Sequence, residues 1–599
     1  VECMTVEDLR VFAQRCRLDA SCVIRAMEGR ATVKEADIAA AAAKIQDEEN
    51  RGAIAKNGAF DVPETLVDAG RLPAPGGVVE TTAFSKMGFK VSSLANGVRV
   101  ATKTTDFLDD QVLVRAFARG GLSEVPEKQY LDALYAGTIA GELGMFGLRP
   151  ETLFDALAGK RADVAAKTGT YFRRVDGDTS PTDIEVGLQL MYMLFTQDVR
   201  SMLVPEELEA VLRMQEQAIR NRNRDPASVY NQTIRRLVYG KTFQSAPLRV
   251  ADVRKMVPMN ACEHFNAAFA DPSQFTVVLV GAFDEKRVLK MCEKYLGCIT
   301  PPPPPNVSTS GAVIGDVWRR DDFENITPAP FTFPKGAVTR EIRSYMVEPM
   351  SMASITFPVN IKNPDWDVDR KTSVVTVDGS VTLTREKLLC VFATSIIERR
   401  LLALLRFKFG EIYTCAASAS FAFEDPLARG ALFRGDVMIN FSCDPAAGKR
   451  LARLALEDIK ALQLFGPTVE EVATAVEVET RALEVREQEN AYWRDYYEAV
   501  HNSRLRDLLD GDLDALFSLS EKTRRELMAA LTPEMIKEHL QRCLDVRHRV
   551  VVVLRPQRPL WRRALLPDPT TAEGLAVLSL YGVAAGAAAY LRLKKKAAQ

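Results

Sequence analysis

The sequence has few of the residues that most often indicate a metal site or a disulfide framework. Its 599 residues include ten cysteines, without any Cys-x-x-Cys pair and mostly in apolar surroundings. This usage suits a reducing compartment better than a disulfide framework. We find no metal-binding spacing between a histidine and a cluster of cysteines or carboxylates, and we expect solvated or core imidazoles. The histidines number only four: His264, His501, His539 and His548.

The chain also lacks an excess of charge. Its 78 lysines and arginines are balanced by 79 aspartates and glutamates, which leaves a formal net charge of −1. Because nucleic-acid-binding domains carry a basic patch, this balance argues against a nucleic-acid partner. Hydrophobic residues make up 47% of the sequence and charged residues 26%, which excludes disorder for most of it. The length leaves room for two domains of about 200 to 250 residues each.

One pattern of helix, short turn and buried strand occurs three times. The clearest copy is residues 260–281, NACEHFNAAFADPSQFTVVLVG, and the others are residues 532–554 and 5–27. A spacing of roughly 250 residues is too long for a solenoid and indicates tandem domains of one type, each closed by this helix and strand. The first copy has no domain body before it. We therefore expect residues 1–27 to be the tail of a domain whose main part is absent from this chain.

After this tail, the sequence predicts a linker at residues 28–88 and an α+β domain at residues 89–300. Asn96-Gly97 stands between two alternating runs and indicates a hairpin, with a third strand in QVLVRAFARGG. Helical patterns follow from Tyr130 to about Val238. The helix and strand of residues 260–281 close the domain, which we expect to be an antiparallel sheet with helices packed on one side.

A second domain of the same kind is predicted at residues 336–558, after a stiff proline-rich linker at residues 301–335. Residues 360–382 are polar and without periodicity, which indicates a surface insertion. The predicted architecture is thus a duplicated α+β fold. Its second copy is expected to have strands at 351–359, 412–421 and 431–443, and helices at 387–409, 446–464 and 469–510.

The C-terminal end contains a long uncharged run. Residues 574–591, GLAVLSLYGVAAGAAAYL, follow a predicted juxtamembrane linker at 559–573 and precede a basic tail at 592–599. This run nearly reaches the length of about 20 residues that spans a membrane, and its basic flank suits a C-terminal transmembrane helix. The alternative is an alanine-rich helix buried in protein. With the anchor, we expect an intracellular membrane protein, with an organelle such as a mitochondrion or plastid favoured over secretion.

Several segments of residues 89–300 are similar to a known family. They are LANGVRVATKTTDFLDDQVLVRAFARGGLSEVPEKQY, GELGMFG, LFDALAGKR, TSPTDIEVGLQLMYMLFT and DPSQFTVVLVGAFD. They resemble the third domain of a pitrilysin/insulinase-type (M16) zinc metallopeptidase of the PqqL-like branch, and residues 336–558 resemble the fourth. Such peptidases are clamshells of four homologous domains, with zinc on the first. The resemblance implies that this chain is the half without zinc. Its partners would be a zinc-bearing N-terminal half, on the same polypeptide or a separate subunit, and an unfolded peptide substrate.

The zinc motif of that family, HxxEH, does not occur in this chain. The helix expected to correspond, near residues 133–137, offers no ligand. Residues Met535, Glu538 and His539 come nearest, but methionine occupies the first ligand position and the segment is the closing helix of the repeat. The resemblance therefore implies zinc in the complete enzyme, bound by the N-terminal half, and no metal bound by this chain.

Arg406 and Tyr413 are the candidate catalytic and substrate-binding residues. They lie in LLRFKFGEIYTCAAS, where the spacing places the arginine at a helix end and the tyrosine where the next strand begins. By resemblance, such a pair helps to hold the peptide and the developing oxyanion opposite zinc. The alternatives are that Arg406 only caps its helix or pairs with Glu411, and that Tyr413 is a half-buried strand residue.

Three functions therefore compete. The first is the closing half of an M16 zinc metalloendopeptidase, inactive by itself, which binds peptide and supplies Arg406 and Tyr413 to the active site. The second is a catalytically inactive scaffold or core subunit of an organellar membrane complex. The third is a membrane-tethered peptide-binding module. Retention of Arg406 and Tyr413 favours the first over the second, since a scaffold needs neither.

Overall fold

The structure is a computed structural model that describes residues 4–15, 34–54, 63, 65–240, 242–302, 318, 333–370, 372–421, 432–503 and 505–557. The chain divides into two compact units, Val1–Pro63 and Glu64–Gln599. The first unit contains α1 (Val6–Ala13), capped by the Thr5 hydroxyl, and α2 (Glu35–Asn50). Helix α1 agrees with the helix predicted in the first copy of the repeat. The strand predicted after it lies outside the described residues.

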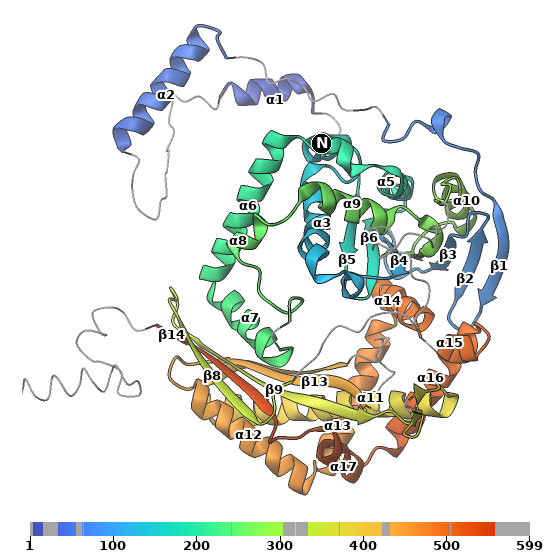
Figure 1. The fold of residues 1–599 in the computed structure, drawn as a ribbon, viewed down its shortest axis with the longest axis vertical. Helices are drawn as coiled ribbons and strands as arrows, with labels where there is room; N and C mark the ends of the chain where they lie inside the picture. The colour runs from blue at the N-terminus through green and yellow to red at the C-terminus, as the bar shows by residue number, and fades with distance from the viewer. Residues whose placement is uncertain are drawn as a thin grey trace, which may run out of the picture. The chain divides into compact units, whose positions relative to one another are not determined.

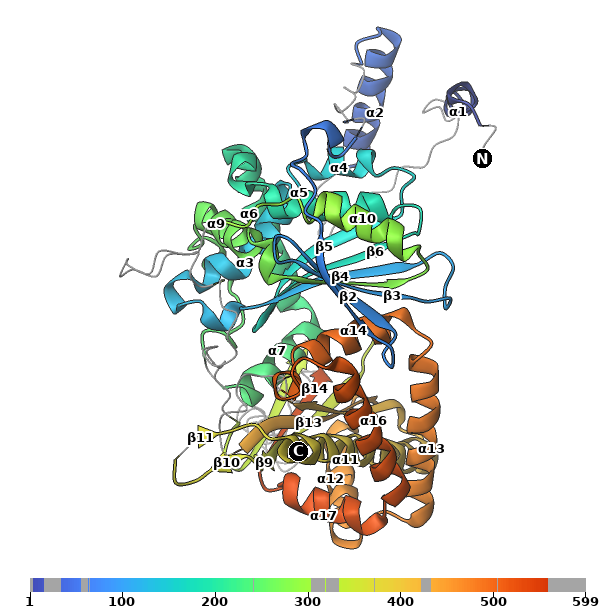
Figure 2. The ribbon, with the colours of Figure 1, turned by 90° about the vertical axis from the view of Figure 1, so that its right-hand side faces the viewer.

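The second unit contains a seven-stranded sheet with the order β1-β2-β3-β7-β4-β6-β5 (Figures 1 and 2). Neighbouring strands are antiparallel except β3 and β7, which run parallel. The predicted hairpin joins β2 to β3, and Gly97 in its turn has a φ of 92°, which favours glycine. The strands are β1 (Val78–Phe84), β2 (Phe89–Leu94), β3 (Arg99–Thr104), β4 (Val112–Arg119), β5 (Ala162–Thr168), β6 (Phe172–Thr179) and β7 (Thr276–Gly281).

Three strands of this sheet lie where the sequence predicted other structure. Strand β1 begins inside residues 28–88, so that range is not all linker. Strands β5 and β6 interrupt the stretch predicted to be helical. Strand β6 carries the charged sequence FRRVDGDT because its charges are satisfied inside the fold: Arg173 is 1% exposed and donates to the carbonyls of Arg119 and Ala268.

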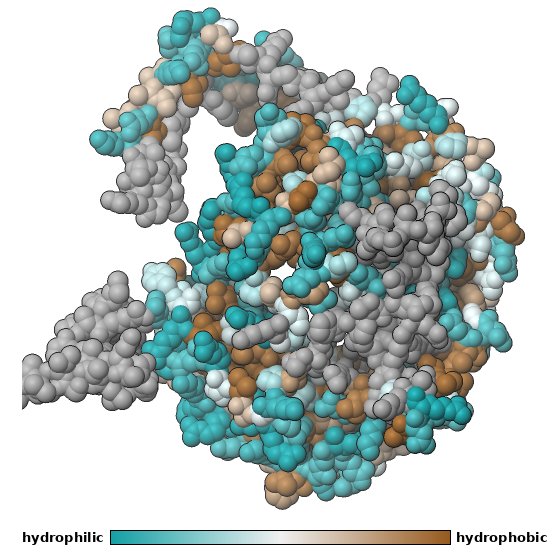
Figure 3. All heavy atoms as spheres, viewed as in Figure 1, coloured by the Kyte–Doolittle hydropathy of each residue, from teal (hydrophilic) through white to brown (hydrophobic). Residues whose placement is uncertain are grey.

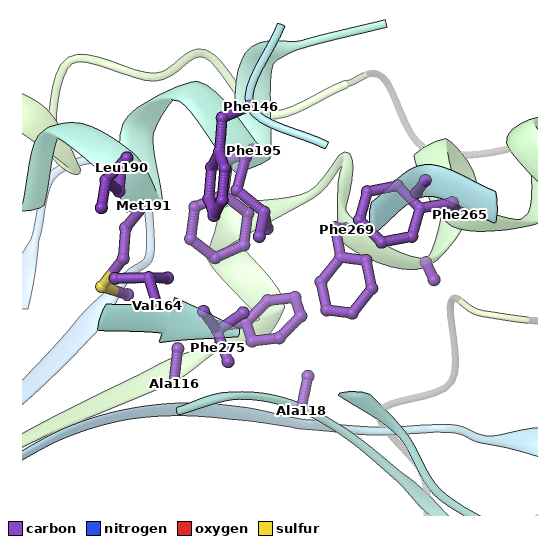
Figure 4. Close-up of a cluster of buried hydrophobic side chains, with 14 of the residues drawn as sticks. Ala116, Ala118, Phe146, Val164, Leu190, Met191, Phe195, Phe265, Phe269 and Phe275 are labelled. Atoms are coloured by element: carbon purple, nitrogen blue, oxygen red, sulfur yellow. The ribbon is translucent and has the colours of Figure 1, made fainter. Parts of the chain in front are cut away.

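One face of the sheet is covered by helices that enclose the larger hydrophobic core. The ring of Phe275 lies 5.1 Å from that of Phe195 and 6.0 Å from that of Phe269 (Figure 4). Trp318 is fully buried in the same core. The helices of this half are α3 (Tyr130–Leu143), α4 (Pro150–Ala156), α5 (Ile184–Thr196), α6 (Pro205–Arg224), α7 (Pro226–Val238), α8 (Val250–Val253), α9 (Pro258–Phe269) and α10 (Glu285–Tyr295).

A five-stranded sheet repeats the same topology. Its order is β12-β13-β9-β14-β8, which matches β5-β6-β4-β7-β3 position by position, with one parallel pair, β14 and β8. The closing helix and strand are α9 and β7 in one copy and α17 and β14 in the other, as the repeat predicted. The duplicated α+β fold is therefore confirmed, with sheets that are mixed rather than purely antiparallel. The strands are β8 (Ala337–Ser344), β9 (Ser351–Lys362), β12 (Ile412–Phe421), β13 (Leu432–Cys443) and β14 (Arg549–Pro556).

The helices of this second copy differ from prediction in their bounds. Helix α11 begins at Val377, inside the predicted insertion, because the Thr376 side chain caps it. The same predicted insertion contains the end of β9 and the short paired strands β10 (Trp366–Asp367) and β11 (Thr372–Ser373). The single helix predicted at 469–510 is three helices, and α16 was not predicted. The helices are α11 (Val377–Leu401), α12 (Gly448–Phe465), α13 (Val469–Arg486), α14 (Asn490–His501), α15 (Leu505–Leu508), α16 (Leu513–Ala530) and α17 (Pro533–Cys543).

Helices of each copy also pack against the sheet of the other copy. Tyr497 on α14 and Leu513 on α16 pack against Phe89 and Val278 on the second face of the seven-stranded sheet. Tyr230 on α7 packs in return against the outer face of β14 (Figures 1 and 2). Each sheet thus has helices of the other copy on part of its second face, in addition to the helices of its own copy that were predicted on one side. Tyr497 on α14 belongs to the core, because it is 1% exposed.

The helices that pack on the five-stranded sheet turn mostly polar side chains toward the solvent. On the face drawn in Figure 3, the surface over α12 and α17 is largely hydrophilic, as expected for amphipathic helices with one face on a sheet. Within the described ranges, no helix combines the length and apolar character that crossing a membrane requires. The predicted span at residues 574–591 lies outside those ranges.

Candidate functional site

Arg406 lies near the C-terminal end of the helical stretch that begins with α11. The chain continues from α11 into a π-helical segment, η8 (Leu402–Lys408), in which Leu405 is fully buried. Gly410 then has a φ of 68°, and its N–H donates to the Arg406 carbonyl at 2.8 Å, which closes the helix with a left-handed residue. Such π-helical insertions change the direction of the side chains after them and recur at functional sites. The structure therefore places Arg406 at a helix end, as the spacing predicted.

The side chains around Arg406 form an exposed cationic and aromatic turn, which we call the Arg406 turn (residues 406–411). Arg406 is exposed, and its guanidinium lies 5.6 Å from the ring centre of Phe407, a side chain that is 78% exposed. The carboxylate of Glu411 pairs with Arg450 on α12. Glu411 is therefore held by a different arginine from the one that the alternative interpretation of Arg406 required.

Tyr413 is the second residue of β12, as predicted. The pairing of β12 with β13 is irregular here, because the register shifts between Ile412 and Cys415. Irregular pairing of this kind redirects side chains and often lies beside functional sites. The side chain of Tyr413 lies outside the described part of the chain, so its distance from Arg406 stays a prediction.

The residues near the expected zinc positions do not fit a catalytic zinc. In helix α3, Ala133, Tyr135 and Ala136 are buried and offer no ligand. In helix α17, Glu538 is exposed whereas His539 is 1% exposed, so the two side chains of the near-miss motif face opposite environments. A catalytic zinc needs ligands around an open position that substrate can reach. These residues of α3 and α17 therefore lack the arrangement that a catalytic zinc requires.

Three of the four histidines have the ordinary environments that were predicted. His264 is fully buried, and burial lowers its pKa to about 4. Burial likewise lowers the pKa of His501, which lies between the rings of Phe117 and Tyr497. His548 is half exposed, with Nδ1 3.2 Å from a carboxylate oxygen of Asp545.

His539 corrects the prediction that no histidine joins a cluster of cysteines and carboxylates. Helix α17 places His539 and Cys543 one turn apart, and helix α11 brings Glu386 against them. One donor atom from each residue lies within 4.8 Å of the others. The signal available in the sequence was the spacing of four between His539 and Cys543, but nothing local indicates Glu386, which lies 153 residues earlier.

Comparison with known proteins finds relatives of this chain. Residues 260–478 match the family described as Peptidase M16 inactive domain. The "Zinc protease PQQL-like" of Arabidopsis thaliana is 34% identical over 559 residues, which cover 93% of this chain and 52% of that protein. This chain therefore spans about half the length of that relative. The chain is homologous to the M16 zinc proteases.

Solved structures agree on the fold. The periplasmic protease PqqL from Escherichia coli is similar with a TM-score of 0.58 and 16% sequence identity, over 86% of this chain and 52% of that one. A peptidase M16 inactive domain from Pseudomonas fluorescens is similar with a TM-score of 0.52 and 15% identity, over 78% of this chain and 98% of that one. At these identities the likeness concerns the fold alone.

Proposed function

We propose that this chain is the half without zinc of an M16-type zinc metalloendopeptidase. In this proposal it closes over an unfolded peptide held between it and a zinc-bearing N-terminal half, and it has no peptidase activity by itself. The observation that carries the proposal is the Arg406 turn: an exposed arginine at the end of the π-helical segment η8, shortly before strand β12, whose second residue is Tyr413. The similarity to one half of a zinc protease supports it.

The two residues would have different roles. The guanidinium of Arg406 can donate charge-assisted hydrogen bonds to peptide carbonyls, and a tyrosine hydroxyl can donate to an oxygen that gains negative charge during attack on the scissile bond. Because Glu411 is engaged by Arg450, the turn presents positive charge to the peptide. Zinc bound by the other half would polarise the scissile carbonyl and activate water.

The exposed Phe407 side chain adds an apolar contact to the same turn. An aromatic ring beside a guanidinium can accept a peptide side chain while the arginine binds the backbone. Unfolded peptides of varied sequence offer both groups, whereas a folded protein surface seldom presents free carbonyls. The turn therefore supports a peptide substrate without defining its sequence.

The remaining assignments of the proposal concern the chain as a whole. Residues 89–300 and 336–558 would be the third and fourth domains of the clamshell, and residues 1–27 the end of the second. Residues 574–591 would anchor the protein in an intracellular membrane, with that of a mitochondrion or plastid favoured. Removal of residues 574–599 should release the protein from alkaline-washed membranes. If the shortened protein stays in the membrane fraction, the anchor assignment is wrong.

A second candidate is a catalytically inactive scaffold, which the lack of HxxEH in the sequence and the predicted membrane anchor favour. The mass of the natural polypeptide under denaturing conditions, measured with whatever stays bound to it, separates the two. A species of about twice this length, or a co-purifying subunit with HxxEH, supports the peptidase. A species of this length alone, without such a subunit, supports the scaffold.

A further inference from the structure

Two helices of the second copy bring three potential metal ligands together and place a fourth one helical turn away. Glu386 and Cys390 lie four residues apart on α11, and His539 and Cys543 lie four residues apart on α17. Side chains with this spacing lie on one face of a helix, one turn apart. Because α11 and α17 pack against each other, the two faces meet.

The distances between the donor atoms suit a small tetrahedral site. Nδ1 of His539 lies 2.9 Å from Oε2 of Glu386, and Sγ of Cys543 lies 3.7 Å from that nitrogen and 3.8 Å from that oxygen. Tetrahedral zinc with bonds of about 2.0 to 2.3 Å requires separations of roughly 3.3 to 3.8 Å between its ligand atoms. An ion could therefore bind all three atoms after a small movement of Glu386 away from His539.

Cys390 is the natural fourth ligand. It is 2% exposed and lies one turn after Glu386 on the same face of α11. Burial, and then the negative charges of Cys543 and Glu386, raise the pKa of its thiol, which places all three groups in one electrostatic neighbourhood. The sulfur of Cys390 is not within hydrogen-bonding contact of the other three atoms, so its side chain must turn toward them.

We propose that Glu386, Cys390, His539 and Cys543 form a structural site for a zinc ion between α11 and α17. Two sulfurs, an imidazole nitrogen and one carboxylate oxygen suit zinc, whereas magnesium and calcium prefer oxygen ligands throughout. The site is closed, because His539 and Cys543 are 1% and 4% exposed. It would therefore join helices and take no part in catalysis.

The neighbouring arginine completes the charge balance of the proposed site. Zinc with two thiolates, one carboxylate and a neutral imidazole carries one net negative charge, and a buried net charge needs a partner. The guanidinium of Arg542 lies 2.5 Å from Oε1 of Glu386, opposite the oxygen that faces His539. The arginine thus neutralises the cluster without occupying the position of the ion.

Binding requires both thiols to release protons. The thiolate is the form of cysteine that binds a metal, so two protons leave when zinc enters the site. Nε2 of His539 has no hydrogen-bond partner in the described part of the protein, so the ring is oriented by Nδ1 alone.

Cobalt(II) substitution tests the site, because thiolate ligands give cobalt an intense charge-transfer absorption. We expect one equivalent of zinc per chain in the purified protein and, after exchange, the thiolate absorption with tetrahedral d–d bands. Cys543→Ser and Cys390→Ala should each weaken binding at least tenfold. Cys415→Ser is the matched control, since Cys415 is a buried cysteine of the same copy, and it should bind normally.

The metal content of the unaltered chain decides the question even if the variants do not fold. Less than a tenth of an equivalent of zinc after incubation with zinc and removal of excess would overturn the proposal. Equal cobalt spectra in Cys543→Ser and the unaltered protein would overturn it as well. A disulfide between Cys390 and Cys543 that persists in reducing buffer would also overturn it. None of these results depends on peptidase activity, so they leave the proposed function unaffected.

Discussion

The carboxylate of Glu498, on α14, accepts hydrogen bonds from Arg115 at 2.9 Å and from Arg174 at 2.6 Å, on strands β4 and β6. Glu498 belongs to the second copy and both arginines belong to the first. This ion-pair group lies at the edge of the apolar contact made by Tyr497 and Phe89, whose ring centres are 4.8 Å apart. It therefore helps to hold α14 on the face of the seven-stranded sheet that carries Phe89 and Val278.

Glu498→Gln should reduce the free energy of unfolding by about 1–3 kcal/mol, since Glu498 is 4% exposed and its loss leaves two guanidiniums without a buried carboxylate. Asp495→Asn is the matched control. Asp495 contacts the same Arg115, but its side chain is 57% exposed, so its replacement should change stability by less than about 1 kcal/mol. Denaturant unfolding of both variants checks this, and equal effects would contradict it.

His264 should make stability depend on pH. Its pKa is about 6.5 when unfolded and is lowered to about 4 in the fold by burial, only partly opposed by Asp132. The unfolded chain therefore binds more protons between these values. This contribution to stability is complete above pH 6.5 and is lost as the pH falls toward 4, by up to about 3 kcal/mol.

Unfolding measured at pH 7.5 and pH 5 tests this prediction. His264→Leu should reduce the difference in stability between the two pH values. If His264→Leu keeps the full difference, the titrating group is another residue.

Tyr413→Phe in the complete enzyme should lower peptide turnover by roughly 10- to 1000-fold, as loss of one oxyanion donor does. Tyr345→Phe removes an equivalent hydroxyl from a side chain that is 76% exposed and outside the proposed site, so it should be neutral. Steady-state hydrolysis of a peptide by both variants is the measurement. Unchanged turnover in Tyr413→Phe would remove the residue from the active site.

Arg406→Ala should weaken peptide binding and slow turnover, because the exposed guanidinium is proposed to hold the peptide backbone. The control is Lys408→Ala, an exposed cation two residues later in the same turn. If both variants raise KM equally and leave kcat alone, Arg406 contributes only positive charge. If neither changes KM or kcat, the turn does not contact substrate.

The closing units of both copies could be predicted because their strands carry continuous apolar runs. Strands β7 and β14 are buried on both faces, so TVVLVG and VVVVL show no alternation, and each follows an amphipathic helix. Strand β6 could not be predicted in this way. Its arginines and aspartates are satisfied by partners distant in sequence, such as Ala268 for Arg173 and Glu498 for Arg174.

The two candidate sites differ in how far the sequence alone predicts them. The position of Arg406 at a helix end and of Tyr413 at a strand start follows from local sequence, and the structure agrees with both positions. The contact between His539 and Glu386 depends on how α11 packs against α17, a tertiary relationship that spacing within one helix cannot give. The exchange of α7 and α14 between the two sheets was missed for the same reason.

Peptide hydrolysis by this chain mixed with its zinc-bearing half tests the central claim most directly. Each half alone, each at the concentration used in the mixture and with zinc present, should hydrolyse an unstructured peptide at background rate. The mixture should hydrolyse it well above that rate, and much less when this chain carries Tyr413→Phe. A zinc-bearing half whose activity is the same with and without this chain would contradict the account.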